Sequence, residues 1–202
     1  MTLIDSLDML AVMGNHSEFR RAAGIVGDYF PDFSLDVNVS VFETTIRVLG
    51  GLLSAHLIAI DPRLGVYPLS GSEGAYEGRL LQLARDLGER LLPAFRTRTG
   101  AQLYLLITQS TLLTHDAGIP YGTVNLRYGV PRGETDIAST AGAGSLVVEM
   151  ETLSSLTGDR RYGDAAYAAT EALFDRRSAI GLLGKHISTR VRLLIQSHQY
   201  SF

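Results

Sequence analysis

The strongest constraint on the fold lies in residues 40–60, SVFETTIRVLGGLLSAHLIAI, which are apolar around most of the circumference of a helix. A helix with so little polar surface is stable only when other elements cover it. Ser40 or Asn38 can cap its start. Gly50 and Gly51, each about 1 kcal/mol less favourable than alanine inside a helix, suit the close approach of another helix. The stretch therefore predicts a central helix that is buried on most of its surface.

Five further segments show the 3.6-residue spacing of apolar side chains that is typical of amphipathic helices. They are residues 2–13, 17–30, 75–95, 137–157 and 160–178. Strand signals are almost absent, although short strand pairs are expected in the Gly- and Pro-rich loop 118–135. The pattern predicts an all-α chain of stacked helical hairpins, as an open solenoid or a closed α/α toroid. The long glycine-rich loops favour the toroid.

Composition and charge exclude several classes of function. The net charge of −3, from 18 basic and 21 acidic residues, gives no basic footprint, so nucleic acid is not an expected partner. The chain has no cysteine, which excludes disulfides and thiolate metal sites. The longest apolar run, residues 48–60, is too short to span a bilayer, so no membrane span is expected. Asp5 and Asp8 stand where a signal peptide would have a basic residue, and no targeting signal is expected.

Glu43 and Arg47 are charged residues within the apolar stretch, and two interpretations are open. A Glu and an Arg four residues apart form an ordinary helix pair when they lie on an exposed face. Here apolar residues flank the pair on nearly every side, so the charges must be paired or must face a cavity. A carboxyl group in a partly apolar pocket has a raised pKa, as a general acid requires. For Asp5 and Asp8, in the first helix, capping and structural ion pairing are the default interpretation.

Two Asn-x-Ser sequons, NHS at Asn15 and NVS at Asn38, fit the acceptor pattern for N-glycosylation. Such triplets also arise by chance in a chain of 202 residues. Alone they favour a secretory setting only weakly.

Several motifs occur together in an order that resembles one family. They are TLIDSLDML, SVFETTIRVLGGLLSAHL, LARDLGERLLPAF, GIPYGTVNLRYGV, GET, TAG and LSSLTGD. The chain is similar to the family 47 glycoside hydrolases, the class I α-1,2-mannosidases, and within them to fungal-type members of the EDEM-like branch. The resemblance implies an (α/α)7 barrel, of which this chain would be a part. It also implies inverting removal of mannose from high-mannose N-glycans on misfolded glycoproteins in the lumen of the endoplasmic reticulum, for ER-associated degradation, with a possible oxidoreductase partner.

The resemblance also implies roles for three residues. Glu43 resembles the general acid of the family motif FExxIR, and Arg47 of the same motif resembles a residue that contacts the sugar. Glu149 is expected to line the cavity as a substrate-binding residue, although helix packing is the plainer interpretation. Inverting hydrolysis needs a second carboxylate about 6.5–9.5 Å from the first, to activate water. The family binds one Ca²⁺ through a threonine near the end of the domain.

The chain departs from the family pattern in four places. Residues 1–188 are expected to form the N-terminal part of the barrel, interrupted by an atypical insertion at 101–118 and followed by a non-homologous tail at 189–202. The later catalytic carboxylates and the calcium-binding threonine have no counterpart, so no metal ligand is assigned. Ser139 replaces a cysteine that EDEM-like proteins often carry before TAG. We therefore expect a mannosidase-like chain that is inactive as it stands, or a non-catalytic module that binds glycans or client proteins.

Overall fold

The structure is a computed structural model that describes residues 1–97 and 118–189. Most of the ordered elements are helices, as expected for an all-α fold. Besides the long helix treated below, they are α1 (Thr2–Asp5), α2 (Leu7–Val12), α3 (His16–Tyr29), α6 (Arg79–Leu91), the 3₁₀ turn η2 (Leu92–Phe95), α8 (Thr140–Gly144), α9 (Val147–Thr157) and α10 (Arg161–Phe174). Most of the predicted insertion 101–118 and of the predicted tail 189–202 lies outside the described residues.

The predicted central helix forms and runs without a break from Val41 to Ile60. It comprises α4 (Val41–Glu43), a π-helical stretch η1 (Thr44–Leu49) and α5 (Gly50–Ile60). Ser40 is the N-cap, because its Oγ accepts a hydrogen bond from the Glu43 N–H at 3.3 Å. Of the two caps that the sequence allows, the structure uses Ser40.

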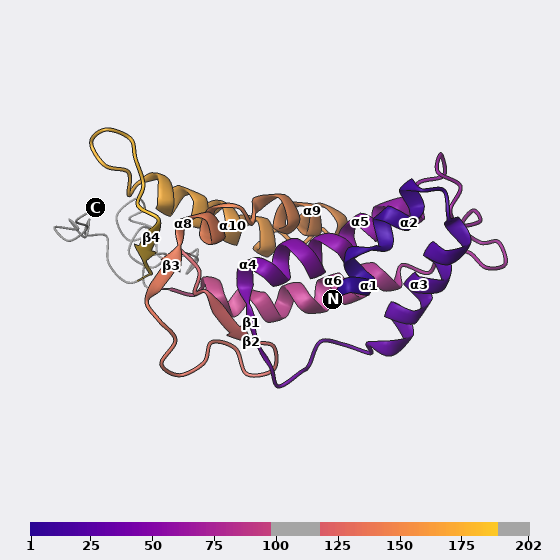
Figure 1. The fold of residues 1–202 in the computed structure, drawn as a ribbon, viewed down its shortest axis with the longest axis horizontal. Coiled ribbons are helices and arrows are strands. Elements are labelled where there is room, and N and C mark those ends of the chain that lie inside the picture. Colours follow the sequence, from indigo (N-terminus) through magenta and orange to yellow (C-terminus); the bar gives the residue numbers. More distant parts are fainter. Residues whose placement is uncertain (98–117, 190–202) are drawn as a thin grey trace.

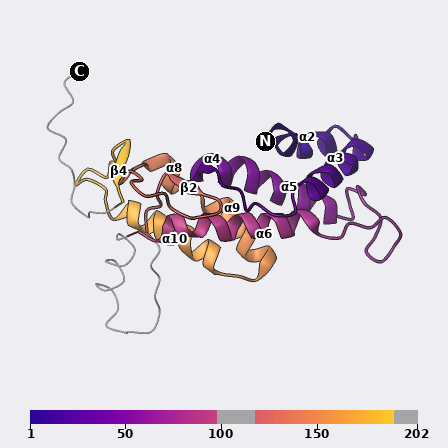
Figure 2. The same cartoon turned by 90° about the horizontal axis from the view of Figure 1, so that it is seen from below.

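The helices are arranged along one long axis (Figure 1). The central helix, α6 and the α9–α10 hairpin lie side by side, with α5 in contact with α6 and α9, and α6 in contact with α9. Helices α1, α2 and α3 gather at one end, and the strands lie toward the other. Figure 2 shows the same arrangement from below, with α6 running the length of the layer. The arrangement is consistent with a partial α/α fold.

The core fills the space between these helices with leucines and a few aromatic rings. The central helix and α6 supply most of them, and their fully buried members include Leu49, Leu52, Leu80, Leu83, Leu87 and Leu91. Burial of each leucine side chain contributes about 1.5–3 kcal/mol. Tyr162 of α10, which is also fully buried, packs on Gly88 of α6, where a Cβ would lie 3.1 Å from its ring. The apolar faces predicted for the central helix and α6 are therefore the faces that pack.

Two antiparallel strand pairs tie distant segments together. Strand β1 (Asn38–Ser40) pairs with β2 (Thr123–Asn125), and β3 (Ile137–Ser139) pairs with β4 (His186–Ser188). The sequence predicted strand pairs within the loop 118–135, and this is only partly right. The loop contributes β2 and a bridge between Asn125 and Gly129, but the partner strand β1 comes from the start of the central helix.

Several predicted helix boundaries differ from the observed ones, and the helix predicted over 160–178 ends at Phe174. The segment 2–13 is divided at Ser6, and residues 75–78 precede α6 without helical structure. The segment 137–157 begins as strand β3, because Ile137–Ser139 pairs with β4 before α8 starts. Helical periodicity does not detect such pairing, since the partner strand lies about fifty residues further along the chain.

The central helix is long and apolar enough, by length and composition, to pass as a candidate membrane span, where the sequence analysis expected none. Half of its most apolar window is buried inside the structure. Core helices of soluble proteins pass the same test, and in this structure α5 contacts α6 and α9.

Candidate functional site

The central helix carries the first two predicted site residues near its start. Glu43 occupies the last position of α4, and Arg47 lies one turn further on, within the π-helical stretch. Their side chains are neighbours, since Arg47 Nη1 lies 3.8 Å from Glu43 Oε2. The structure therefore brings the predicted acid and the predicted sugar contact together.

Arg47 has a second and closer partner in Asp5 of α1. Its Nε and Nη2 both donate to Asp5 Oδ2, at 3.2 and 2.7 Å. The hydrogen bond from Asp5, its negative charge and a smaller contribution from Glu43 raise the pKa of Arg47 above its ordinary value. Of the two alternatives left open for Asp5, ion pairing is the one observed, with a partner 42 residues away.

Of the two interpretations left open for this charged pair, the described part of the chain shows a paired and partly exposed one. The side chain of Glu43 is 49% exposed, and that of Arg47 is 45% exposed. The neighbouring residues Thr44, Thr45, Val48 and Leu49 are buried, so the two charged side chains lie on the more exposed side of the helix. The pair is thus accessible to solvent in the described structure.

The two glycines of the central helix mark where the other site residues approach it. A Cβ on Gly51 would lie 2.8 Å from Ile4 Cγ2, so α1 touches the helix at this point and Asp5 reaches Arg47. A Cβ on Gly50 would lie 3.4 Å from Glu149 Cγ. Glu149 of α9 therefore lies across the same helix. The predicted close approach is confirmed. The two adjacent glycines contact two different helices, α9 at Gly50 and α1 at Gly51.

Glu149 is half-buried, and its two carboxylate oxygens differ in their surroundings. Oε2 is inaccessible to solvent and has no hydrogen-bond partner among the described residues. A buried carboxylate oxygen without a donor is costly, because it has lost water and gained nothing in return. Neither helix packing nor a role in ligand binding is decided by this oxygen, because Glu151 Oε2 on the same helix is buried without a partner in the same way.

The π-helical stretch at Thr44–Leu49 is the feature of the site that sequence reasoning missed. The Gly50 N–H donates to the Thr45 carbonyl, five residues back, and to the Arg47 carbonyl, three residues back, and not to the carbonyl four residues back. Such a turn inserts one extra residue and rotates the side chains that follow it, and short π-helical turns are frequent at functional sites. Here it lies between Glu43 and the two glycines. Only the run of β-branched residues Thr44, Thr45 and Ile46 hinted at an irregular helix.

Ser139, where the resemblance to EDEM-like proteins implies a cysteine, has a structural role in this chain. It is the N-cap of α8, and its Oγ accepts from the Gly142 N–H at 3.3 Å. Serine is among the preferred capping residues. The substitution therefore leaves the start of α8 well capped.

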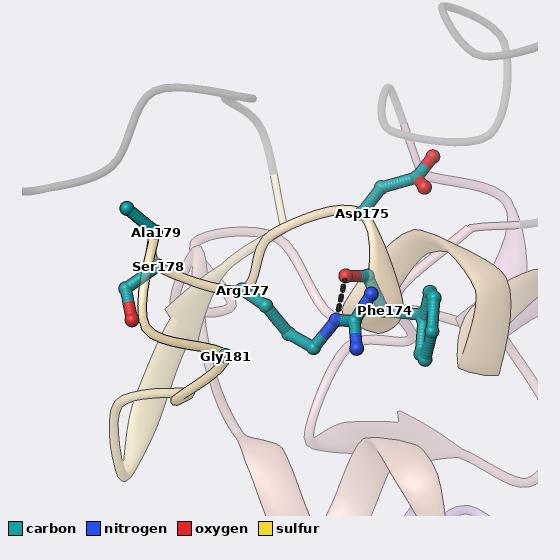
Figure 3. Close-up of a pocket in the computed structure, with 6 residues that line it drawn as sticks. All are labelled: Phe174, Asp175, Arg177, Ser178, Ala179 and Gly181. Carbon is teal, nitrogen blue, oxygen red and sulfur yellow. Dashed lines mark hydrogen bonds between the residues drawn. The ribbon is translucent and has the colours of Figure 1, made fainter.

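A shallow hollow lies at the end of α10, remote in sequence from these residues (Figure 3). Its volume is about 400 Å³, and among the described residues it is lined by Phe174, Asp175, Arg177, Ser178, Ala179 and Gly181. The Arg177 guanidinium lies 3.2 Å from the centre of the Phe174 ring, and its Nε donates to the Phe174 carbonyl at 2.9 Å. Arg177 and Phe174 thus form a cation–π contact with each other. None of the residues that line the hollow was predicted as a site residue.

The family resemblance implies a calcium ion, but the sequence analysis assigns no ligand for it in this chain. Within residues 1–97 and 118–189, no three His, Asp or Glu side chains converge in a way that could hold a metal ion. Asp5, the acidic residue nearest to Glu43 in the site, is already paired with Arg47. These residues therefore do not fit a resident calcium ion, and we derive no step through one.

The model of glycosyl hydrolase family 47 matches residues 1–200. This chain belongs to that family.

Individual relatives place the chain more closely. It is 47% identical over 187 residues to the ER degradation-enhancing alpha-mannosidase-like protein 2 of Mus musculus, covering 93% of this chain and 28% of that protein. It is 44% identical to the Alpha-mannosidase I MNS5 of Arabidopsis thaliana, again over 28% of that protein. The chain thus spans less than a third of the length of these relatives, and it resembles the EDEM-like branch.

A solved structure supports the fold. The alpha-1,2-mannosidase from Trichoderma reesei superposes with a TM-score of 0.71 and 28% sequence identity, covering 93% of this chain and 35% of that one. The expected fold class, part of an all-α barrel of helical hairpins, agrees with this match.

Proposed function

We propose that this chain supplies the sugar-binding wall of an α-1,2-mannosidase-like glycoside hydrolase. It would trim mannose from N-glycans of misfolded glycoproteins in the lumen of the endoplasmic reticulum. Family membership and the names of the EDEM-like relatives support the reaction class and the compartment. One structural observation carries the proposal. Asp5, Arg47 and Glu43 form a continuous charged row on an accessible face, with Glu149 against the same helix.

The geometry gives each residue a distinct task. Arg47 has five N–H donors, of which two are used by Asp5, so three remain for sugar hydroxyls. Asp5 accepts from Nε and Nη2, which leaves Nη1 directed toward Glu43. A sugar bound to Arg47 would therefore have Glu43 beside it, where the carboxyl group can protonate a departing glycosidic oxygen. Glu149 would accept hydrogen bonds from hydroxyls of the same sugar.

A second function is favoured by one observation, the exposure of Glu43. A general acid is usually held protonated at neutral pH by an apolar pocket. Glu43 is half-exposed in the described chain, which suits a carboxylate that accepts hydrogen bonds from a bound sugar without donating a proton. The alternative is therefore a non-catalytic module that binds glycans, or client proteins through their glycans.

The family resemblance implies a calcium ion and an oxidoreductase as partners, and the described residues limit how each could bind. The described residues gather no acidic cluster, so we propose that any calcium takes its direct protein ligand from outside them. An oxidoreductase partner would have to bind without a disulfide to this chain, because the chain contains no cysteine.

The experiment measures release and binding separately, with the purified 202-residue chain and a high-mannose glycan. Mannose release that Glu43→Gln abolishes would establish the hydrolase. Glycan binding without release, lost on Arg47→Ala, would establish the binding module. Arg63→Ala is the matched control, since Arg63 also pairs with an aspartate at 2.7 Å, but on the loop after the central helix. A chain that neither releases mannose nor binds the glycan would refute both functions.

A further inference from the structure

We propose that Asn38 is an N-glycan acceptor and that the folded chain carries a glycan on its Nδ2 atom. The proposal rests on the secretory setting of the proposed function. Asn38 begins the sequon Asn-Val-Ser, but the sequon by itself is weak evidence. The structural evidence is a set of hydrogen bonds that fixes which end of the Asn38 amide faces solvent.

The set is centred on Asn125, opposite Asn38 in the strand pair β1–β2. Asn125 is only 9% exposed. Its Oδ1 accepts from the backbone N–H groups of Arg127 and Tyr128, both at 3.0 Å. Its Nδ2 donates to Asp36 Oδ1 at 3.0 Å and to Asn38 Oδ1 at 2.9 Å. All the hydrogen-bonding capacity of this amide is used.

The orientation of a side-chain amide is normally ambiguous, because its oxygen and nitrogen are nearly alike in shape. At Asn125 chemistry removes the ambiguity. A flipped amide would turn its NH₂ group toward two backbone N–H donors and its oxygen toward the Asp36 carboxylate. Every contact would then join two donors or two acceptors. Asn125 must therefore present Nδ2 to Asn38.

The orientation of Asn38 follows from that of Asn125. A donor at 2.9 Å requires an acceptor, so Asn38 must present Oδ1 to Asn125. Its Nδ2 is then the end of the amide that Asn125 does not bind, and Asn38 is exposed to solvent. Glycosylation replaces one hydrogen on Nδ2 and leaves Oδ1 unchanged. The hydrogen bond to Asn125 consequently survives the modification, and the folded chain accommodates the sugar without rearrangement.

The transfer itself is a substitution at the anomeric carbon of an oligosaccharide carried on a lipid pyrophosphate. The bond between that carbon and the pyrophosphate oxygen breaks, and a bond from the carbon to Asn38 Nδ2 forms. Nδ2 loses one proton, and the lipid pyrophosphate leaves with the electron pair. The chain contributes the acceptor amide and the hydroxyl of Ser40 in the sequon, and the transferase of the endoplasmic reticulum supplies the catalysis.

Ser40 links the sequon to the candidate site. It shares the exposed face of β1 with Asn38, two residues away, and caps the helix that carries Glu43. Threonine at this position keeps both the sequon and a capping oxygen, whereas alanine removes both. This position therefore provides a matched pair of variants.

The test expresses the full chain behind a secretory leader in eukaryotic cells, with Asn15→Gln so that a single sequon remains. We expect one glycan, removable by a peptide N-glycosidase, on the soluble, protease-resistant fraction. It should disappear in the double variants that add Asn38→Gln or Ser40→Ala, and remain with Ser40→Thr. Because transfer occurs on the chain as it enters the endoplasmic reticulum, a variant that misfolds still reports whether its sequon was used.

Two results would overturn the proposal. One is an unmodified Asn38 in the Asn15→Gln chain. The other is a glycan found only on aggregated protein, which would show that the folded chain does not accommodate it. Neither result depends on mannose release or glycan binding. A chain that is modified at Asn38 but has no affinity for mannose would refute the proposed function and leave this inference intact.

Discussion

Arg47 and Asp5 form the closest ion pair of the candidate site, with two guanidinium nitrogens on one carboxylate oxygen at 2.7 and 3.2 Å. Glu43, one turn away on the same helix, is more distant from Arg47 at 3.8 Å. The guanidinium is thus fixed from outside its own helix. Because the pair is partly exposed, its contribution to stability is small. Its importance lies in holding the Arg47 donors in one direction.

Asp5→Asn should therefore weaken glycan binding severalfold while changing the melting temperature little. The amide keeps the shape of Asp5 but removes the charge that orients Arg47, which then turns toward Glu43. The measurement is a binding isotherm for a high-mannose glycan beside a thermal melt. Asp8→Asn is the control, since Asp8 lies next to Ser54 and does not contact Arg47. If both variants lost the same affinity, the negative charge near α1 and α2 would affect glycan binding in general, and the specific contact of Asp5 with Arg47 would not matter.

Gly51→Ala should destabilise the fold by about 1–3 kcal/mol, which is typical of overpacking. The added Cβ would lie 2.8 Å from Ile4 Cγ2 and 3.3 Å from the Ile4 carbonyl oxygen, so α1 must move. Glycan binding should also fall, because α1 carries Asp5. Denaturant unfolding measures the first effect.

Gly24→Ala provides the matched control for this glycine. Gly24 lies inside α3 with nothing within 4 Å of the added Cβ. Alanine there should stabilise the helix by about 0.5–1 kcal/mol through the lower entropy of the unfolded chain. If Gly51→Ala were also stabilising, α1 would not depend on close contact with the central helix.

Glu149→Gln should reduce glycan binding without loss of stability. Glutamine fills the same space over Gly50, and removal of the charge relieves the burial of an unpaired carboxylate oxygen. Glu151→Gln, two residues along α9, also removes a carboxylate with a buried, unpartnered oxygen, but this carboxylate pairs with Arg160 at 2.8 Å and should leave binding unchanged. A thermal melt and a binding isotherm on both variants separate the two roles. Unchanged affinity in Glu149→Gln would leave helix packing as its function.

The sequence predicted those features of the site that depend on local patterns. The central helix, its Ser40 cap and the packing glycines follow from apolar periodicity, capping preference and the cost of glycine in helices. The helical hairpin α9–α10 follows in the same way, with Gly158 in the left-handed conformation at φ 73° that ends α9.

The features that were missed depend on tertiary contacts. The rule for residues four apart favours Glu43 as the partner of Arg47, but Asp5 is closer because Gly51 lets α1 approach. Strand β3 was predicted as helix. Its partner strand β4 lies beyond α10, so the local sequence pattern gives no sign of the pairing. The exposure of Glu43 depends on how other elements pack around the central helix, and the apolar flanks in the sequence do not report it.

His56 should make stability depend on pH in a predictable direction. Its ring is 5% exposed, and Nδ1 lies 3.1 Å from Tyr76 Oη, which itself accepts the Leu80 N–H at 3.0 Å. The Tyr76 hydroxyl hydrogen is therefore free to bond a neutral His56. Burial lowers the pKa of His56 below its ordinary value of 6.5.

The sign follows from proton linkage. As the pH falls below about 6.5, the unfolded chain binds a proton at His56 that the folded chain resists. Stability should therefore be fully present at pH 7.5 and should fall from near pH 6.5 downward, until the folded chain also protonates. Urea unfolding at pH 7.5 and 5.5 measures the difference. His56→Gln should reduce it, whereas His186→Gln, at an exposed position, should preserve it. If the stability of His56→Gln depended on pH as strongly as that of the wild type, the loss of stability at low pH would come from the carboxylates and not from His56.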